Sequence, residues 1–178
     1  MTRFIDSMHV ERVDNAHFYV DALFKERFGV DFPIPRDNCG LSIPTPPENW
    51  RQYVAFYKWD AQHIEPVGFC NWIQYDDAYL EGGLCVSGTF YRRLSRAHFS
   101  ECRERGGVAQ LMMERGAAEL NDRAAWFGNV GDKQSMIVTK RVGYVTTPYP
   151  NIIVKWFKDL PAAKREELMA KIYGIGPF

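Results

Sequence analysis

Three consecutive segments constrain the fold of this chain more than any other feature of its sequence. They are residues 50–59, 66–75 and 78–86, each rich in aromatic or other apolar side chains, and short polar connections around 60–63 and 76–77 lie between them. Segments of this composition favour strands, and connections this short join antiparallel neighbours. The sequence therefore predicts a three-stranded antiparallel meander.

Helical patterns flank the meander. Asp14 or Asn15 can cap a first helix over about 15–28, and Gly29 supplies a left-handed stop. After the meander, the pattern predicts a helix opened by Gly106–Gly107, a strand over 124–130, a helix over 134–142, strands over 144–147 and 152–157, and a last helix from near Asp159 to Gly174. This order predicts a mixed α/β (α+β) fold, in which a mixed, mostly antiparallel sheet is flanked by helices on both faces.

Length and charge narrow the possible functions. The chain has 178 residues, the length of one ordinary domain, so we expect a single domain over 1–178. Hydrophobic residues make up 46% and charged residues 25%, the balance of a soluble globular protein. Lys and Arg together number 22, as do Asp and Glu, so no net charge attracts nucleic acid or an anionic membrane. We expect neither as a partner.

The cysteines and the N-terminal segment predict a cytoplasmic protein. No two cysteines form a C-x-x-C pair, so we interpret all four as reduced, mostly buried thiols: Cys39, Cys70, Cys85 and Cys102. A charge interrupts the N-terminal segment before any apolar run typical of a signal peptide, and no segment is apolar for long enough to cross a bilayer. The histidines lack metal-ligand spacing, so we predict no metal site.

Two segments predict irregular backbone. Five prolines within residues 31–49 lack a backbone donor, so this stretch is expected to be a loop. Gly82–Gly83 lies inside the third strand segment, where glycine weakens an ordinary strand. The pair indicates either a β-bulge or a place where a ligand approaches bare backbone.

Residues 103–112, which read Arg-Glu-Arg-Gly-Gly-Val-Ala-Gln-Leu-Met, carry the clearest chemical signal. Free amides at a helix N-terminus can bind phosphate, and Arg103 and Arg105 can add charge-assisted hydrogen bonds. Neither a Gly-Lys-Ser/Thr run nor a G-x-G-x-x-G motif is present, so the segment is not a Walker loop or a dinucleotide fingerprint. The alternative interpretation is a plain helix entry with solvated arginines and a flexible Gly106–Gly107 turn.

This segment resembles the signature Gln/Arg-x-x-Gly-x-Gly/Ala of the GNAT superfamily of acyl-CoA-dependent N-acyltransferases, because Gly107-Val108-Ala109 matches its second half. A second match follows. Asn129 and the run from Ser135 to Tyr144 look like the family's Asn, Ser/Ala, short helix and Lys-x-Gly-Phe/Tyr ending. The resemblance covers roughly residues 50–146 and requires an insertion over about 91–102, which could form a lid.

The resemblance implies an N-acyltransferase, most simply an N-acetyltransferase, in which an amine attacks the thioester of acetyl-CoA or another acyl-CoA directly. The acceptor would be a small-molecule or peptide amine, and relatives of this kind often form homodimers. The residues that the resemblance places at the cofactor are Cys85, Val86, Arg103, Arg105, Gly106, Gly107, Val108, Ala109, Asn129 and Ser135.

The resemblance also implies catalytic candidates. Glu81 lies in the strand that leads to the thioester, so it is the candidate general base; the alternative is an ordinary strand carboxylate on a solvent face. The family's general acid is a tyrosine whose position falls on Thr139 in this sequence. Tyr144, which is close by, is therefore the candidate acid.

Other interpretations of the same residues remain open. Asn129 and Ser135 can simply cap the short helix, and Cys85 can be an inert buried thiol. Glu104 and Thr139 stand where the family has Gln/Arg and Tyr. These departures favour a second hypothesis, a GNAT-like module that binds CoA or another nucleotide without turnover. A third hypothesis is an enzyme unrelated to CoA.

Overall fold

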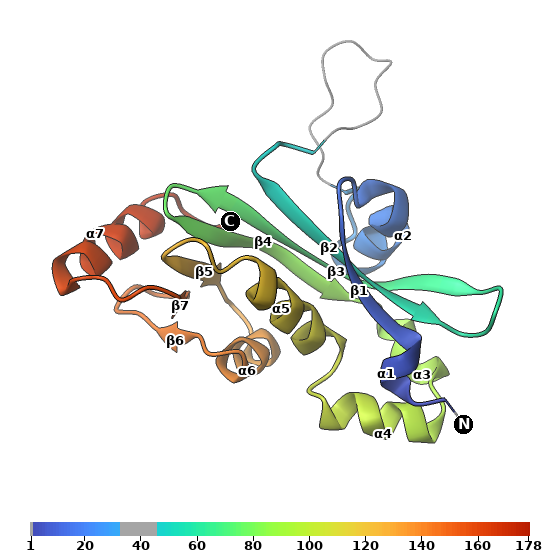
Figure 1. The fold of residues 1–178 in the computed structure, drawn as a ribbon. Coiled ribbons are helices and arrows are strands. Elements are labelled where there is room, and N and C mark those ends of the chain that lie inside the picture. Colours follow the sequence, from blue (N-terminus) through green and yellow to red (C-terminus); the bar gives the residue numbers. More distant parts are fainter. Residues whose placement is uncertain (1, 33–45) are drawn as a thin grey trace, which may run out of the picture.

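The computed structural model describes residues 2–32 and 46–178, and its strands form one seven-stranded sheet in the order β1-β2-β3-β4-β5-β7-β6 (Figure 1). β2, β3 and β4 pair as consecutive antiparallel neighbours, which confirms the predicted meander. The prediction missed β1, which extends the meander by pairing with β2. The strands are β1 Met8–Val13, β2 Trp50–Lys58, β3 Ile64–Tyr75, β4 Ala78–Val86, β5 Ala125–Asn129, β6 Val145–Thr146 and β7 Ile152–Trp156.

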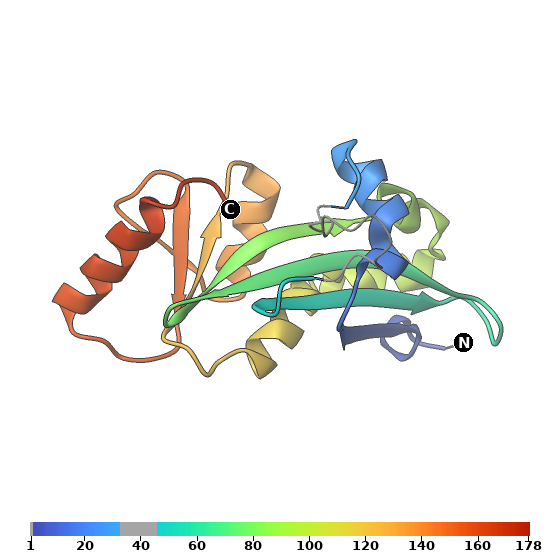
Figure 2. The same ribbon diagram turned by 90° about the horizontal axis from the view of Figure 1, so that it is seen from above.

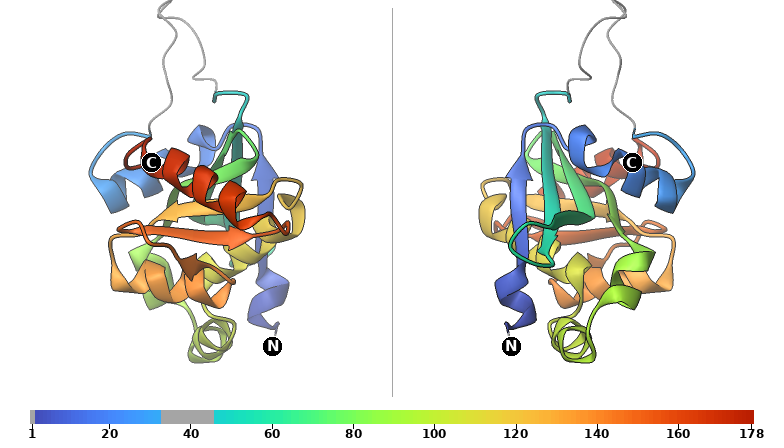
Figure 3. Two further views of the ribbon diagram at one scale, coloured as in Figure 1. Left: turned by 90° about the vertical axis from the view of Figure 1, so that its left-hand side faces the viewer. Right: turned by 90° about the vertical axis from the view of Figure 1, so that its right-hand side faces the viewer.

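Helices cover both faces of the sheet, which confirms the predicted fold class. α5 packs on one face in an apolar cluster that contains Trp72 and Met112, and α2 packs on the opposite face against Phe69. Figure 3 shows α2 and α7 together on one side of the sheet and α6 on the other. The helices are α1 Phe4–Ser7, α2 His17–Phe28, α3 Gly88–Arg93, α4 Arg96–Glu104, α5 Val108–Glu119, α6 Lys133–Arg141 and α7 Ala162–Tyr173.

The first predicted helix differs from the observed helix at its start. α2 begins at His17, and its N-cap is Ala16, which has no side chain that could cap. Neither Asp14 nor Asn15 takes the cap position; Asn15 lies one residue further out, where its Oδ1 accepts a hydrogen bond from the His17 amide at 3.1 Å. Gly29 ends the helix with a φ of 71°, as predicted.

Three other expectations can be compared with the structure. The segment 91–102, expected as an insertion, is largely helical and belongs to α3 and α4. The last helix begins at Ala162, directly after Pro161 and as predicted from Asp159-Leu160-Pro161, and Gly174 is its C-cap. Most of the proline-rich segment and Cys39 lie within 33–45, outside the described residues. The other cysteines are free and buried, which confirms the interpretation of Cys70, Cys85 and Cys102 as buried thiols.

Gly116 lets α5 lie close to the sheet. A Cβ atom at this position would lie 2.5 Å from Cη2 of Trp72, closer than real carbon atoms approach. Trp72 cannot move aside easily, because it is fully buried and packs on Trp126 with ring centroids 4.7 Å apart. The contact between Gly116 and Trp72 on β3 therefore sets the distance between α5 and the sheet.

We predict that Gly116→Ala destabilises the protein by about 1–3 kcal/mol, because the added methyl group overpacks the core against the Trp72 indole. Helix propensity alone would stabilise this variant, since alanine is the better helix former by about 1 kcal/mol. A loss of stability would therefore come from packing. Urea unfolding measures the change, and Ala118→Gly on the exposed face of α5 is the control, with a loss of about 1 kcal/mol from propensity alone. A stabilised Gly116→Ala variant would contradict the packing described here.

Candidate active site

The parallel pair of strands at the centre of the sheet separates shortly after it forms. β4 pairs with β5 only through Ala78, Tyr79 and Leu80, whereas residues 81–86 pair with β3 alone. The register of β4 also shifts here, because Asn71 is opposite Gly83 and Trp72 is opposite Glu81, which leaves Gly82 as an extra residue. Figure 2 shows β5 and β7 running across the direction of β2–β4. The bulge predicted at Gly82–Gly83 is therefore confirmed.

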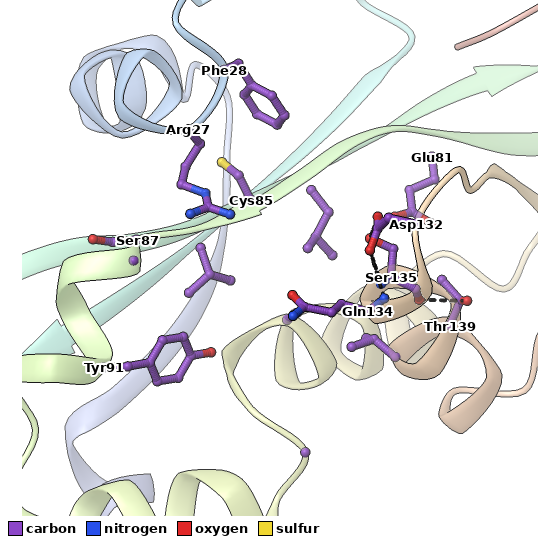
Figure 4. A pocket seen from close by; sticks show the side chains of 16 residues that line it. Arg27, Phe28, Glu81, Cys85, Ser87, Tyr91, Asp132, Gln134, Ser135 and Thr139 are labelled. Atoms are coloured by element: carbon purple, nitrogen blue, oxygen red, sulfur yellow. Dashed lines mark hydrogen bonds between the residues drawn. The ribbon is translucent and has the colours of Figure 1, made fainter.

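A cavity of about 530 Å³ opens where the two strands separate. α2, β4, α3, α5 and α6 all contribute to its wall (Figure 4). The structure places these predicted site residues in the lining: Glu81, Cys85, Val86, Gly106, Ala109 and Ser135. Side chains more than fifty positions apart in the sequence therefore meet in one cavity.

Glu81 combines burial with the absence of a partner. Part of the residue faces the cavity, but its Oε2 atom is shielded from solvent and has no hydrogen-bond partner among the described residues. Gly128 on β5 leaves room for the carboxyl group, since a Cβ there would lie 3.2 Å from Glu81 Oε2. Burial raises the pKa of Glu81 to about 7. Glu81 can therefore take up or release a proton near neutral pH, as a general base must.

The turn before α5 differs from the expected anion site. Gly106 and Gly107 have φ angles of 84° and 91°. Their amides are not bare, because they donate to the carbonyl oxygens of Arg103 (3.0 Å) and Cys102 (2.9 Å). The Val108 amide donates to the Tyr91 hydroxyl at 3.3 Å.

The first turn of α5 nevertheless keeps free donors. The amides of Ala109 and Gln110 have no backbone acceptor within the described residues, because the helical ladder starts with the bond from Leu111 to Gly107 (3.3 Å). Ala109 lines the cavity. Among the predicted cofactor residues, Ala109 thus offers a free amide to the cavity, whereas the amides of Gly106 and Gly107 do not.

The two arginines of the predicted anion site do not reach the cavity lining. Arg105 Nε donates to Glu101 Oε1 at 3.1 Å, so its charge is paired along α4. The guanidinium of Arg103 lies over the ring of Phe99, with its carbon 5.8 Å from the ring centroid. Neither side chain is therefore among the predicted site residues that the structure brings together in the cavity lining.

The architecture can be compared with solved structures. The ribosomal-protein-S18-alanine N-acetyltransferase of Escherichia coli aligns with a TM-score of 0.57 and 8% identity over 87% of this chain and 97% of that chain. A GNAT-family acetyltransferase of Streptococcus pneumoniae aligns with a TM-score of 0.53 and 10% identity, over 84% and 99%. A chimera of the Vibrio cholerae spermidine N-acetyltransferase SpeG and hSSAT aligns with a TM-score of 0.52 and 11% identity, over 85% and 96%.

The chain has the GNAT acetyltransferase fold. At the level of sequence, no protein-family model matches the chain, and a search of curated proteins gives no match either. The separation of β4 from β5 thus occurs in a known fold. The roles of the side chains around it rest on their own geometry.

Of the two residues considered for the general acid, one lines the cavity and the other does not. Thr139, at the position of the family's tyrosine, lines the cavity, but its hydroxyl donates to the carbonyl oxygens of Ser135 (3.0 Å) and Met136 (3.2 Å). Tyr144 is buried and is not part of the cavity lining. Burial holds its pKa well above the usual range, and the nearby Glu81 raises it further. Neither hydroxyl offers a readily released proton to the cavity.

Two of the remaining predicted cofactor residues lie outside the cavity, and the predicted cap of α6 belongs to another residue. Val108 is fully buried in the core, and Asn129 pairs with Ile152 in the sheet, so neither lines the cavity. The cap of α6 is Asp132, whose Oδ1 accepts from the amides of Gln134 (2.8 Å) and Ser135 (2.9 Å). The alternative that Asn129 or Ser135 caps this helix is therefore wrong.

Cys85 lines the cavity as an unreactive thiol. Burial raises its pKa to about 12, and the positive charge of Arg27 lowers it only in part. A thiol with this pKa is not ionised at neutral pH. The interpretation of Cys85 as inert is therefore favoured over that of a nucleophile.

The prediction missed several residues of the cavity wall. Arg27 and Phe28 come from the C-terminal end of α2, Tyr91 from α3, and Asp132 from the turn before α6. Only Asp132 had a local signal, because Asp is a preferred N-cap directly before a helical pattern. The others reach the cavity through tertiary packing, which leaves no trace in their own segments.

The described residues show neither a cluster of metal ligands nor a membrane-spanning helix. Among the described residues, no three or more His, Cys, Asp and Glu side chains are placed to hold a metal ion. No helix within the same residues has the length and apolarity needed to cross a bilayer.

We predict that Gly83→Ala destabilises the protein by about 1–3 kcal/mol, because Gly83 has a φ of 137°, a conformation that disfavours a Cβ. The control is Gly131→Ala. A Cβ at either position would meet no atom within 4 Å, but only Gly83 has a positive φ, so the control should change stability by less than about 0.5 kcal/mol. Urea unfolding of both variants makes the comparison, and equal effects would contradict a strained bulge.

Proposed function

We propose that this protein is an acyl-CoA-dependent N-acyltransferase, with acetyl as the expected group, that transfers the acyl group to an amine by direct attack in a ternary complex. The observation that carries the proposal is the buried Oε2 atom of Glu81, which has no hydrogen-bond partner in the described part of the chain, at the point where β4 and β5 separate. The GNAT fold supports it, because two of the solved structures that align are named as acetyltransferases of an alanine amine and of spermidine.

We expect the cavity to hold an extended thioester with its phosphate groups at one end. Residues 81–86 of β4 have no partner strand on the β5 side, so their backbone can bond to the amides of a pantetheine chain. The free amides of Ala109 and Gln110 begin α5, where the helix dipole favours negative charge. We place the diphosphate of the acyl-CoA there, and its acyl group near Glu81.

Glu81 supplies the proton transfer that the reaction requires. The ionised carboxylate accepts a proton from the acceptor ammonium, and the free amine then attacks the thioester carbonyl carbon. A nitrogen–carbon bond forms while the carbon–sulfur bond breaks. The nitrogen then releases its second proton to solvent to give the neutral amide, and the sulfur leaves as a thiolate that takes a proton from solvent. Because thiols have a pKa of roughly 8.5, the thiolate can leave without a dedicated acid, which suits a cavity where Thr139 has no free proton.

The arrangement of hydroxyl groups also supports a second candidate, a non-catalytic module that binds CoA. Thr139 donates to backbone carbonyls, and Tyr144 lies outside the cavity lining. Calorimetric binding of acetyl-CoA together with an assay for free thiol separates the two functions. Binding with no thiol release across a broad panel of amines would select the second candidate.

We predict that kcat rises with pH through about 7 and levels above it, because Glu81 accepts the proton only when ionised. Glu81→Gln should lower kcat at least about a hundredfold and leave acetyl-CoA binding unchanged. Glu167→Gln, which removes an exposed carboxylate on α7 outside the cavity lining, should change neither value. A Glu81→Gln enzyme with wild-type kcat would refute the assignment of the base.

We also predict that Glu81→Gln changes the pH dependence of stability. Since burial raises the folded-state pKa from 4.5 to about 7, the folded protein keeps a proton that the unfolded chain releases, and stability falls as pH rises through this window. Between pH 4.5 and pH 8, the free energy of unfolding of the wild type should fall by up to about 3 kcal/mol more than that of the variant. Parallel curves from urea unfolding at several pH values would contradict the raised pKa.

A further inference from the structure

Arg27 is the positively charged residue among the described residues that line the cavity. It forms no ion pair with any described residue. Its Nη1 atom lies 3.3 Å from the place that a Cβ on Gly88, the first residue of α3, would occupy. Figure 4 shows the guanidinium beside Cys85. No hydrogen bond or ion pair within the described residues holds this group. By contrast, Lys25 on the same helix is paired with Asp31 at 3.2 Å.

The carboxylates near Arg27 are engaged elsewhere. Glu26 Oε2 accepts a hydrogen bond from Ser87 Oγ at 3.3 Å. Asp132, across the cavity, accepts two backbone amides and the Ser135 hydroxyl (2.6 Å). Arg27 therefore has no ion pair of its own among the described residues, and its guanidinium, on an exposed residue, is open to a bound anion.

β4 divides the cavity into two sides, and Arg27 lies on the side away from the anion donors of α5. Cys85 packs in the apolar cluster of α2, whereas Leu84 and Val86 pack against the cluster of α5. Figure 4 shows Arg27 and Phe28 on one side of β4 and Tyr91 on the other. The two sides connect because no strand covers the edge of β4 after Leu80. If the acyl-CoA occupies the α5 side, Arg27 faces the other reactant.

We propose that Arg27 binds a carboxylate of the acceptor, so that this enzyme acylates amines that carry a carboxylate group. The inference rests on the proposed function. A guanidinium binds a carboxylate through two parallel hydrogen bonds, which fixes the acceptor in one orientation. Phe28, of which 48% is exposed, lines the cavity beside it and offers an apolar surface to the rest of the acceptor. Glu81, at the other end of the exposed stretch of β4, receives the proton of the amine.

The experiment compares amino acids with their carboxamides, which differ only in the carboxylate. Acceptor kcat/KM and calorimetric binding to the CoA complex are measured for a series of ω-amino acids of increasing chain length, each with its amide. The wild type should prefer the acids by about ten- to hundredfold. Arg27→Gln should abolish that preference, and Arg27→Lys should restore part of it, while KM for acetyl-CoA stays unchanged.

Lys25→Gln is the matched control, because it removes the same charge from the same helix outside the cavity, and it should keep the wild-type preference. Amides used or bound as well as acids would overturn the inference, and so would a panel in which no acid is used or bound. A rise in KM for acetyl-CoA in Arg27→Gln, without a change in acceptor preference, would also overturn it. Acylation of amines that lack a carboxylate would leave the proposed function intact, whereas failure of acetyl-CoA to bind would remove both.

Discussion

The site depends on the early separation of β4 from β5. A parallel pair normally continues while both strands remain extended, but here it ends after Leu80, and β4 turns at the bulge around Gly82. The backbone of β4 beyond this point has lost its neighbour on one side. A strand edge of this kind is a ready partner for extended ligands. The cavity, its two sides and the free backbone of β4 all follow from this one irregularity.

Glu81 shows why the position of the separation matters. The residue is the first on β4 without a partner on β5, and Gly128 opposite it provides space but no hydrogen bond. Desolvation without compensation raises the pKa of the carboxyl group to about 7. The same burial that makes the group a useful base opposes folding once it ionises. Functional sites commonly hold such destabilising groups.

The sequence predicted the elements far better than the site. The meander, the bulge at Gly82–Gly83 and the α5 helix follow from periodicity and from glycine conformational preferences, which act over a few residues. β1 lacks such a signal, because its burial is irregular along the strand. The arginines before α5 were assigned to the cavity from proximity in sequence, but the direction of a side chain depends on the α4 turn that precedes it.

Arg27, by contrast, lines the cavity although the sequence analysis did not predict it there. At the last turn of α2, a basic residue is expected simply because it complements the helix dipole, so nothing in the segment distinguishes it from Lys25. Only the packing of α2 against the end of β4 brings it to the cavity. A local pattern therefore locates the backbone of a binding site more readily than the charges that select its ligand.

A crystal structure of the protein with acetyl-CoA would show whether the acyl-CoA binds where β4 and β5 separate. We expect the pantetheine to lie along residues 81–86 of β4, with the diphosphate at the Ala109 and Gln110 amides and the thioester carbonyl facing Glu81. Acetyl-CoA bound elsewhere on the molecule, or a gap between β4 and β5 that stays empty at saturating acetyl-CoA, would contradict it.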